Sequence, residues 1–366
     1  MRLSDHALFS YALRYERPVR WSDVTEHAAP LVLLRLRSDS GAVGVAEITP
    51  KPTWCGATAR SVAAAIEDIF IPIIKRLDLS DVPAVRRALD GVPDNAAAKV
   101  LIDNACWDLN AATAGRALWG GRERIELSWA LTRQAPHLMA REAADMIAAY
   151  GFRTLKVKGG QGVDVDRAVM REVRAAIGDD VRLYVDANGA YGVAEAADYA
   201  RAMADAGAVM VEDPCAFVPD ARFRDLQAQA PVPLLVDFCC TSLRDAALFI
   251  EQGARALSVK PGRFGLTVAR DMSRLADAAG CASIVGLIVG LMGESALGSL
   301  AGLQFACSLN ASPLPAELSW FLAMQEQIVT AVPKVADGHL ELPPATSMAS
   351  LVDWDAVQRC ATAMRR

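Results

Sequence analysis

The segment GFRTLKVKGG, residues 151–160, places two lysines in an apolar run that is typical of a buried β-strand. Side chains alternate between the two faces of an extended chain, so Lys156 and Lys158 share one face while Leu155 and Val157 share the other. Lysine is rarely buried without a partner, and two neighbouring ammonium groups repel each other. The pair therefore indicates a site at the end of this strand rather than ordinary packing.

Similar strands recur at regular intervals along the chain. Between them lie alanine-rich helical segments, for example VDRAVMREVRAAI at 165–177. Alternation of strand and helix predicts a parallel sheet, and seven or more such units in succession favour a closed (β/α) barrel over an open sheet. The predicted strands are ELSWAL at 126–131, TLKVK at 154–158, RLYVD at 182–186, AVMVED at 208–213, PLLVD at 233–237, ALSVK at 256–260 and ASIVG at 282–286.

Five of the predicted strands finish in a charged residue. Successive charges are separated by 28, 26, 25 and 23 residues, about one βα unit each. A single acidic residue after a strand most often caps the next helix or forms a turn. In a barrel, however, the carboxyl ends of the strands meet on one face, so five charges in phase predict a shared site. These residues are Lys158, Asp186, Glu212, Asp237 and Lys260.

The three carboxylates of this set predict a metal site made of oxygen ligands. Carboxylates from adjacent strands suit a hard cation such as Mg²⁺, which leaves positions open for a substrate oxygen. Zinc would require histidine or cysteine, and the four histidines lie away from these strand ends. We therefore predict Mg²⁺, or alternatively Mn²⁺, bound by Asp186, Glu212 and Asp237.

The two terminal lysines would flank that metal from opposite sides of the barrel. Nearby positive charge lowers the pKa of an ammonium group, so Lys156 would favour the neutral, basic form of Lys158. With Lys260 on the other side, a lysine could remove the proton on the carbon beside a metal-bound carboxylate. The metal would then stabilise the negative charge of the resulting enediolate.

The chain outside the barrel lacks this regular alternation of strand and helix. LVLLRLRSDSGAVGVAEITP at 31–50 predicts a hairpin, residues 57–89 predict several short helices, and residues 96–114 predict one long helix. KVADGHLELPP at 334–344 predicts a turn with short strands, in a tail that could pair with the N-terminal hairpin. The predicted domains are an α+β capping domain at 1–124, the barrel at 125–320 and a returning C-terminal segment at 321–366.

Composition excludes several classes of protein. The chain is 53% hydrophobic and 22% charged, as in a packed globular enzyme, and its net charge of −5 without a basic block argues against a nucleic-acid partner. The eight cysteines form no C-x-x-C pair, which suits reduced thiols in a cytoplasm. The N-terminus shows no signal-peptide pattern, and the longest apolar stretch, SIVGLIVGLMG at 283–293, is too short to cross a bilayer. We expect a cytoplasmic protein with no membrane partner.

Four motifs together resemble the enolase superfamily, specifically its muconate-lactonizing-enzyme subgroup. They are K-x-K at 156–158, VDAN at 185–188, VEDP at 211–214 and KPGRFG at 260–265, and the strand end at Asp237 matches as well. The resemblance extends over essentially the whole chain. It implies a modified (β/α)7β barrel, an α+β capping domain, the same three metal ligands and the same pair of lysines, in a dimer or larger homo-oligomer.

The resemblance also implies further site residues. Asn188 would support the metal site, and Glu294 matches a family position near the seventh strand, although it would also suit a helix N-terminus. The same region, SIVGLIVGLMGES, has no histidine, which argues against the mandelate-racemase subgroup. A departure from the family is Phe238, which stands where glutamate is usual, and this leaves the orientation of the neighbouring ligand and the substrate open.

In this family, loops of the capping domain choose the substrate. We expect four residues of these loops to meet a second carboxylate or a ring, and a fifth, near the eighth strand, to stack on an aliphatic ring or a cationic amine. Each would equally suit loop or core packing. The candidates are Arg17, Arg20, Trp21 and Trp54 for the loops and Trp320 for the eighth strand.

Two bases on opposite faces suit 1,1-proton transfer, so we predict a racemase or epimerase of a small carboxylate. A dehydratase of a hydroxylated acid or cyclic amino acid and a cycloisomerase are alternatives with the same site. A metal-free lyase that forms a Schiff base through a lysine is another alternative. Borohydride would trap its substrate adduct, and chelators would not inhibit it. A scaffold without activity would not bind Mg²⁺, and the complete ligand set argues against it.

Overall fold

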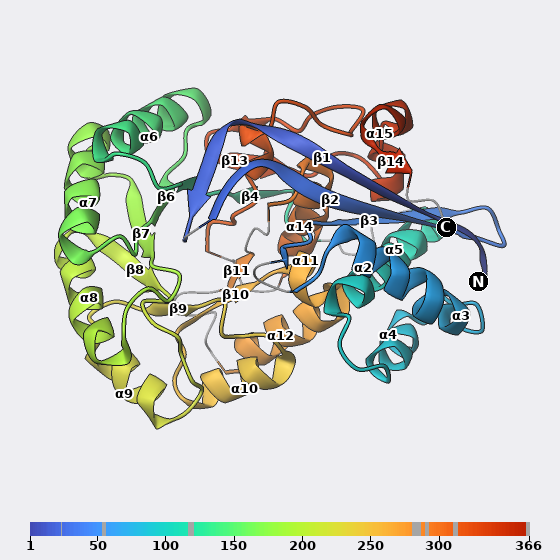
Figure 1. Ribbon diagram of the computed structural model, residues 1–366, viewed down its shortest axis with the longest axis horizontal. Coiled ribbons are helices and arrows are strands. Elements are labelled where there is room, and N and C mark those ends of the chain that lie inside the picture. Colours follow the sequence, from blue (N-terminus) through green and yellow to red (C-terminus); the bar gives the residue numbers. More distant parts are fainter. Residues whose placement is uncertain are drawn as a thin grey trace.

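The computed structural model shows a capping domain beside a barrel (Figure 1). The capping domain occupies the right of the view and the barrel the left, and the first two strands extend from the cap over the barrel. Among the described residues, no helix combines the length and the apolar character needed to cross a membrane. The structure describes residues 1–22, 24–52, 56–115, 121–279, 287–289 (backbone only), 293–309 and 314–363.

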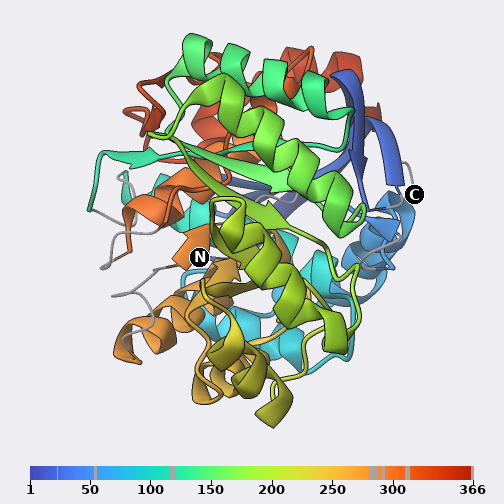
Figure 2. The same cartoon turned by 90° about the vertical axis from the view of Figure 1, so that its left-hand side faces the viewer.

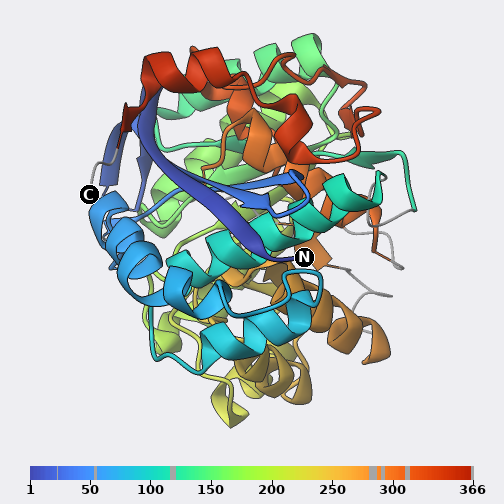
Figure 3. The same ribbon diagram turned by 90° about the vertical axis from the view of Figure 1, so that its right-hand side faces the viewer.

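The capping domain is an antiparallel sheet covered by helices, with strand order β14-β1-β2-β3. Figure 3 shows the long helix α5 lying along the sheet. Its approach is so close that a Cβ on Gly44 would lie 2.4 Å from the backbone oxygen of Ala105, so only glycine fits there. The elements are β1 Leu3–Trp21, β2 Val24–Ser38, β3 Val43–Ile48, α2 Ala59–Ala64, the π-helix η1 Ala65–Phe70, α3 Ile71–Ile74, α4 Val82–Asp90 and α5 Ala96–Ala114. The predicted hairpin and the predicted helix 96–114 are confirmed.

The barrel is a parallel sheet of seven strands in sequence order from β5 to β11, with helices around its outside (Figures 1 and 2). Its strands are β5 Trp129–Leu131, β6 Thr154–Lys158, β7 Arg182–Asp186, β8 Ala208–Glu212, β9 Leu234–Val236, β10 Ala256–Val259 and β11 Leu287–Val289. Its helices are α6 Pro136–Tyr150, α7 Val163–Ile177, α8 Val193–Asp205, α9 Ala221–Gln229, α10 Leu243–Glu251, α11 Pro261–Phe264, α12 Leu266–Ala278 and α14 Ala296–Cys307. The predicted α/β barrel is confirmed, whereas the predicted strand ASIVG falls outside the described residues.

The predicted alternation of faces along the strands is confirmed. Leu155 and Val157 belong to the large core between sheet and helices, while Tyr184, Met210 and Leu235 form a separate cluster inside the barrel. The Nζ atom of Lys156 lies 5.8 Å from the centre of the Tyr184 ring, so this lysine points inward. The apolar cluster therefore fills the inside of the barrel below the charged residues at the strand ends.

The chain after the barrel lies against the segment that precedes β5 and then returns to the cap. An isolated parallel bridge joins Leu127 to Ala316, next to the first barrel strand. Later, β14 pairs antiparallel with β1, with Phe9 opposite Ala363, so the end of the tail lies against the cap sheet. The remaining elements are β4 Arg124–Glu126, the 3-10 helix η2 Trp320–Ala323, β12 Val335–Ala336, β13 His339–Glu341, the 3-10 helix η3 Met348–Leu351, α15 Trp354–Cys360 and β14 Thr362–Ala363.

Candidate active site

Charged residues stand side by side at the carboxyl ends of neighbouring barrel strands. Lys158 ends β6 and is paired in register with Asp186 of β7, which in turn is paired with Glu212 of β8. Asp237 directly follows β9, and Lys260 directly follows β10. The structure therefore brings the five predicted strand-end charges to one mouth of the barrel, where the three carboxylates and Lys260 are buried.

Lys156 lies at the centre of this arrangement and contacts three carboxylates. Its Nζ atom lies 3.0 Å from Asp186 Oδ2, 2.7 Å from Glu212 Oε2 and 2.9 Å from Glu317 Oε1. Burial alone would lower the pKa of Lys156, but the three carboxylates outweigh it and hold that pKa well above its ordinary value. Lys156 is therefore a fixed positive charge that orients the acids around it.

Lys158 is the more accessible lysine of the pair. Its Nζ atom donates to Asp186 Oδ2 at 2.5 Å and to Asn188 Oδ1 at 3.3 Å. Asn188 in turn donates from its backbone N–H to Asp186 Oδ1 at 2.8 Å and from Nδ2 to Oδ2 at 3.2 Å. Asn188 thus fixes the Asp186 carboxylate and the Lys158 ammonium relative to each other.

Lys260 makes the equivalent contact on the other side of the mouth. Its Nζ atom donates to Asp237 Oδ2 at 2.6 Å, and Arg263 Nη1 lies 3.4 Å from Asp237 Oδ1. Burial opposes the charges of both partners, yet the pair holds the pKa of Asp237 low and that of Lys260 high. Strands β6 and β10 are separated by three strands of the sheet, so Lys158 and Lys260 face the mouth from different sides.

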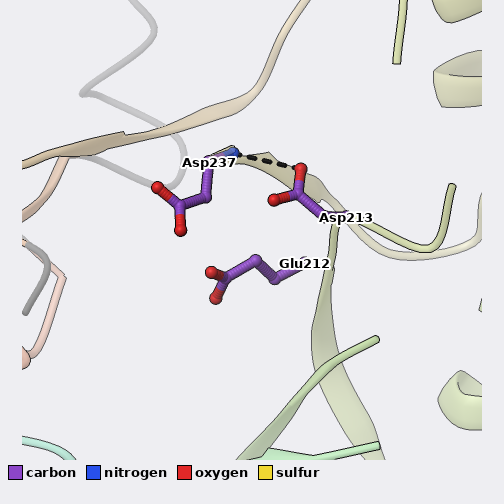
Figure 4. A group of neighbouring side chains, drawn as sticks. All are labelled: Glu212, Asp213 and Asp237. Carbon is purple, nitrogen blue, oxygen red and sulfur yellow. Dashed lines mark hydrogen bonds between the residues drawn. The ribbon is translucent and has the colours of Figure 1, made fainter. Parts of the chain in front are cut away.

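Three buried carboxylates form a cluster that could hold a divalent metal (Figure 4). Oxygen atoms of Glu212, Asp213 and Asp237 all lie within 4.8 Å of one another. Burial and the Asp186 carboxylate raise the pKa of Glu212, although Lys156 Nζ lies 2.7 Å from its Oε2 atom. Buried acids crowded together in this way fit a hard cation, which would relieve their repulsion.

Asp213 differs from the other two members of the cluster because both of its oxygens accept backbone N–H groups, whereas Glu212 and Asp237 contact lysines. Asp213 Oδ1 accepts a hydrogen bond from the Asp237 backbone N–H at 3.1 Å, and Oδ2 accepts one from Phe238 at 2.8 Å. Asp186, which sequence analysis placed among the metal ligands, instead contacts both Lys156 and Lys158. The geometry therefore gives Asp213 the role of holding the backbone beneath Asp237.

Glu317 was not among the site residues predicted from the sequence; it follows Ala316, which forms a bridge with Leu127 just before the first barrel strand. Its Oε1 atom accepts hydrogen bonds from Lys156 at 2.9 Å and from the Tyr184 hydroxyl at 2.5 Å. Burial opposes ionisation, but Lys156 and Lys260 hold the pKa of Glu317 low. A signal was present, because AELSW at 316–320 places an acid about two βα units beyond Lys260.

A cavity opens above these charges, and both domains line it. The barrel contributes Lys156, Lys158 and Lys260, with Trp320 among the aromatic side chains of the wall. The Trp320 ring stacks on Trp129 with a centroid separation of 5.3 Å. The capping domain contributes Tyr15, Val19, Trp21, Glu26 and Lys51.

The other substrate candidates from the sequence lie elsewhere. Arg17 is committed to Glu142, with which it forms an ion pair, and to the Thr132 hydroxyl, to which it donates at 2.9 Å. Arg20 is exposed, and neither arginine lines the cavity. Glu294 is buried directly before the N-cap of α14, and it lines a separate cavity between cap and barrel. Trp54 falls outside the described residues.

Phe238, the departure from the family pattern, packs over the loop that follows β7. A Cβ on Gly189 would lie 2.7 Å from the Phe238 ring, and Gly189 has a φ of +72°. The Phe238 carbonyl accepts a hydrogen bond from Arg263 Nη2 at 2.8 Å. Phe238 therefore fills space beside Asn188, and Arg263 binds the main chain next to Asp237.

Two cysteines follow Phe238 directly. Cys240 is buried and Cys239 half-buried, and the pKa of each thiol is raised to about 12, chiefly by burial.

Comparison with known proteins agrees with this geometry. Residues 138–346 match the family described as enolase C-terminal domain-like, and residues 6–120 match the mandelate racemase / muconate lactonizing enzyme N-terminal domain. The chain is 28% identical to muconate cycloisomerase 1-2 of Acinetobacter lwoffii, over 94% of this chain and 91% of that one. It is 28% identical to the L-Ala-D/L-Glu epimerase of Bacillus subtilis (strain 168), over 81% and 82%.

A solved structure shows the same likeness in three dimensions. The muconate lactonizing enzyme from Mucobacterium Smegmatis complexed with muconolactone superimposes with a TM-score of 0.92 at 29% identity, covering 99% of this chain and 100% of that one. The chain is thus an enzyme of the enolase superfamily and belongs to the mandelate racemase / muconate lactonizing enzyme family, in its muconate-lactonizing-enzyme-like subgroup.

Proposed function

We propose that this enzyme is a Mg²⁺-dependent racemase or epimerase that moves the α-proton of a small carboxylate substrate. The observation that carries the proposal is that Lys158 and Lys260 line one cavity from well-separated strands. A substrate held between them would present one face of its α-carbon to each lysine. Two bases on opposite faces are the arrangement that inversion of a carbon centre requires.

Asp186, Glu212 and Asp237 would hold the metal. When bound, Mg²⁺ supplies electrostatic stabilisation of the negative charge that develops on the substrate carboxylate. Lys156 keeps Asp186 and Glu212 in place through its contacts at 3.0 and 2.7 Å. Asp213 positions Asp237 through the backbone, so this set uses three strand-end acids as ligands and the fourth as a support.

The proton would then pass between the two lysines by way of the α-carbon. One lysine starts neutral and removes the proton from its face, and the other starts as an ammonium group and donates a proton to the opposite face. Asn188 holds the Lys158 ammonium from below, and Asp237 does so for Lys260.

Exchange of the α-proton with solvent tests the mechanism for each lysine separately. Pairs of enantiomeric acids and dipeptides are incubated with the enzyme and Mg²⁺ in deuterated water and followed by proton NMR. We expect Lys158→Ala to stop interconversion but to keep exchange in the one enantiomer that faces Lys260, with the reverse result for Lys260→Ala. Lys75→Ala, at an exposed position of the cap, is the control.

Equal exchange of both enantiomers in Lys158→Ala would overturn the two-base mechanism. Absence of exchange in every acid with the parent enzyme would do the same.

A cycloisomerase is the second candidate because muconate cycloisomerases are among the relatives with the widest coverage. That reaction also forms an enediolate at a carbon beside a carboxylate, so it needs the same metal but only one of the lysines as acid or base. Loss of the ultraviolet absorbance of cis,cis-muconate with the parent enzyme would favour it over epimerisation.

A further inference from the structure

The cavity carries a second charged pair at the end that the capping domain forms. Lys51 Nζ donates to both oxygens of Glu26, at 2.8 Å to Oε1 and 2.7 Å to Oε2. Both residues line the cavity, and their side chains are only 7% and 16% exposed, respectively. A substrate that reaches from the strand ends toward the cap would meet this pair.

The neighbours of the pair hold it in one arrangement. The Trp21 indole donates from Nε1 to Glu26 Oε2 at 3.3 Å, and Lys51 Nζ lies 5.3 Å from the centre of the Trp21 ring. A Cβ on Gly293 would lie 3.5 Å from Lys51 Nζ, so the barrel loop packs closely on the ammonium group. Lys51 therefore has little freedom to turn toward a substrate while Glu26 retains it.

The Lys51–Glu26 pair determines whether the cap end of the cavity attracts or repels a charged group of the substrate. Among the described lining residues, Lys51 is the one cation that the capping domain provides. Alone, it would attract a second carboxylate. With Glu26 bound through both oxygens, an incoming carboxylate gains attraction from Lys51 and meets comparable repulsion from Glu26. Displacing Glu26 is also unfavourable because it would leave a mostly buried carboxylate without its partner.

We infer that Glu26 is a specificity-determining residue that excludes substrates with a second carboxylate at the cap end of the cavity. The substrate is then an acid with a single carboxylate, bound at the strand ends, and its distal part carries no negative charge. This inference rests on the proposed function for the position of the first carboxylate. It also separates this enzyme from relatives named for muconate, a dicarboxylate.

Matched ligands of equal shape test the inference directly. Succinate, glutarate and adipate are each compared with their monoamides, which differ only in the charge at one end, by calorimetry in the presence of Mg²⁺. For the chain length that binds best, we expect the parent enzyme to prefer the monoamide by about tenfold or more, and Glu26→Gln to prefer the diacid. Glu16→Gln, exposed on β1, should retain the parent preference.

A double variant tests whether the gained affinity comes from Lys51. If Lys51 binds the second carboxylate in Glu26→Gln, adding Lys51→Met should remove that gain about completely. Circular dichroism establishes that each variant is folded, and the preference of the parent enzyme needs no variant at all.

Equal binding of diacid and monoamide by the parent enzyme overturns the inference and leaves the proposed function intact. A gain in Glu26→Gln that survives Lys51→Met also overturns it. If no carboxylate ligand binds the parent enzyme with Mg²⁺, the proposed function fails and the inference fails with it.

Discussion

At the scale of single residues, the active site is a balance of charges in which no acid stands alone. Lys156 bridges Asp186, Glu212 and Glu317, and Lys260 holds Asp237. Burial of so many carboxylates is costly unless cations accompany them. The same reasoning favours binding of a metal cation beside these acids, and substitutions can identify which acids would be its ligands.

Substitution of two neighbouring acids distinguishes ligand from support. We expect Asp186→Asn to abolish Mg²⁺ binding because it removes a ligand. Asp213→Asn should weaken binding by about tenfold to a hundredfold, as is usual for a group that orients a ligand. Mg²⁺ titration by calorimetry measures both. Abolished binding in Asp213→Asn with unchanged binding in Asp186→Asn would instead make Asp213 the ligand.

At the scale of elements, the tip of the β1–β2 hairpin is fastened to the strand that carries Lys158. Arg133, just after β5, donates from Nη1 to the Ser22 carbonyl at 2.6 Å and from Nε to the Gly159 carbonyl at 2.9 Å. Its backbone N–H also donates to the Arg20 carbonyl at 3.0 Å. One guanidinium group therefore joins the cap hairpin, next to Trp21, to the loop after β6, next to Lys158.

Loss of this link should loosen the hairpin tip. We expect Arg133→Met to accelerate tryptic cleavage after Arg20 by about tenfold, because the three side-chain hydrogen bonds that join Ser22 to Gly159 are removed. Mass spectrometry identifies the cut, and Arg141→Met, at an exposed position of α6, is the matched control. Identical cleavage rates in the two variants would show that Arg133 does not restrain the tip.

The elements also show what the sequence could and could not predict. Strand-end charges recur once per βα unit, so their meeting at one mouth followed from periodicity alone. Arg17 and Arg20 do not line the cavity because the expected loop at 15–27 is instead the end of the β1–β2 hairpin, where a register shift between Arg14 and Val19 interrupts the strand pairing. The partnership of Glu26 with Lys51 joins a strand to a loop, and no local pattern predicts such a contact.

At the scale of the whole molecule, buried acids fasten the cap to the rest of the chain. Asp108 of α5 accepts hydrogen bonds from the backbone N–H groups of Val45, Met348 and Ala349, which joins the cap sheet to the C-terminal tail. Glu47, at the end of β3, accepts from Tyr11 and from Ser295, which caps the barrel helix α14. The seam between the two domains thus depends on carboxyl groups away from water.

The pH dependence of stability should reveal Asp108. Burial raises its pKa to about 7, whereas an unfolded carboxyl titrates near pH ~4. Between these values the folded chain keeps a proton that the unfolded chain has released, so this group lowers stability as the pH rises from about 4 to 7. We expect Asp108→Asn to show a flatter dependence in urea unfolding at pH 5, 6, 7 and 8. Parallel curves for the parent, Asp108→Asn and the exposed control Asp205→Asn would contradict this assignment.

The shared lining of the cavity has a consequence for how such an enzyme can change over generations. The lysines and acids that would move the proton belong to the barrel, whereas Tyr15, Trp21, Glu26 and Lys51 belong to the first 51 residues. Substitutions in a short N-terminal stretch can therefore change which substrate binds and leave the residues proposed for the reaction unchanged. Exchange of that stretch between relatives would transfer substrate preference without changing the lysines and acids of the barrel.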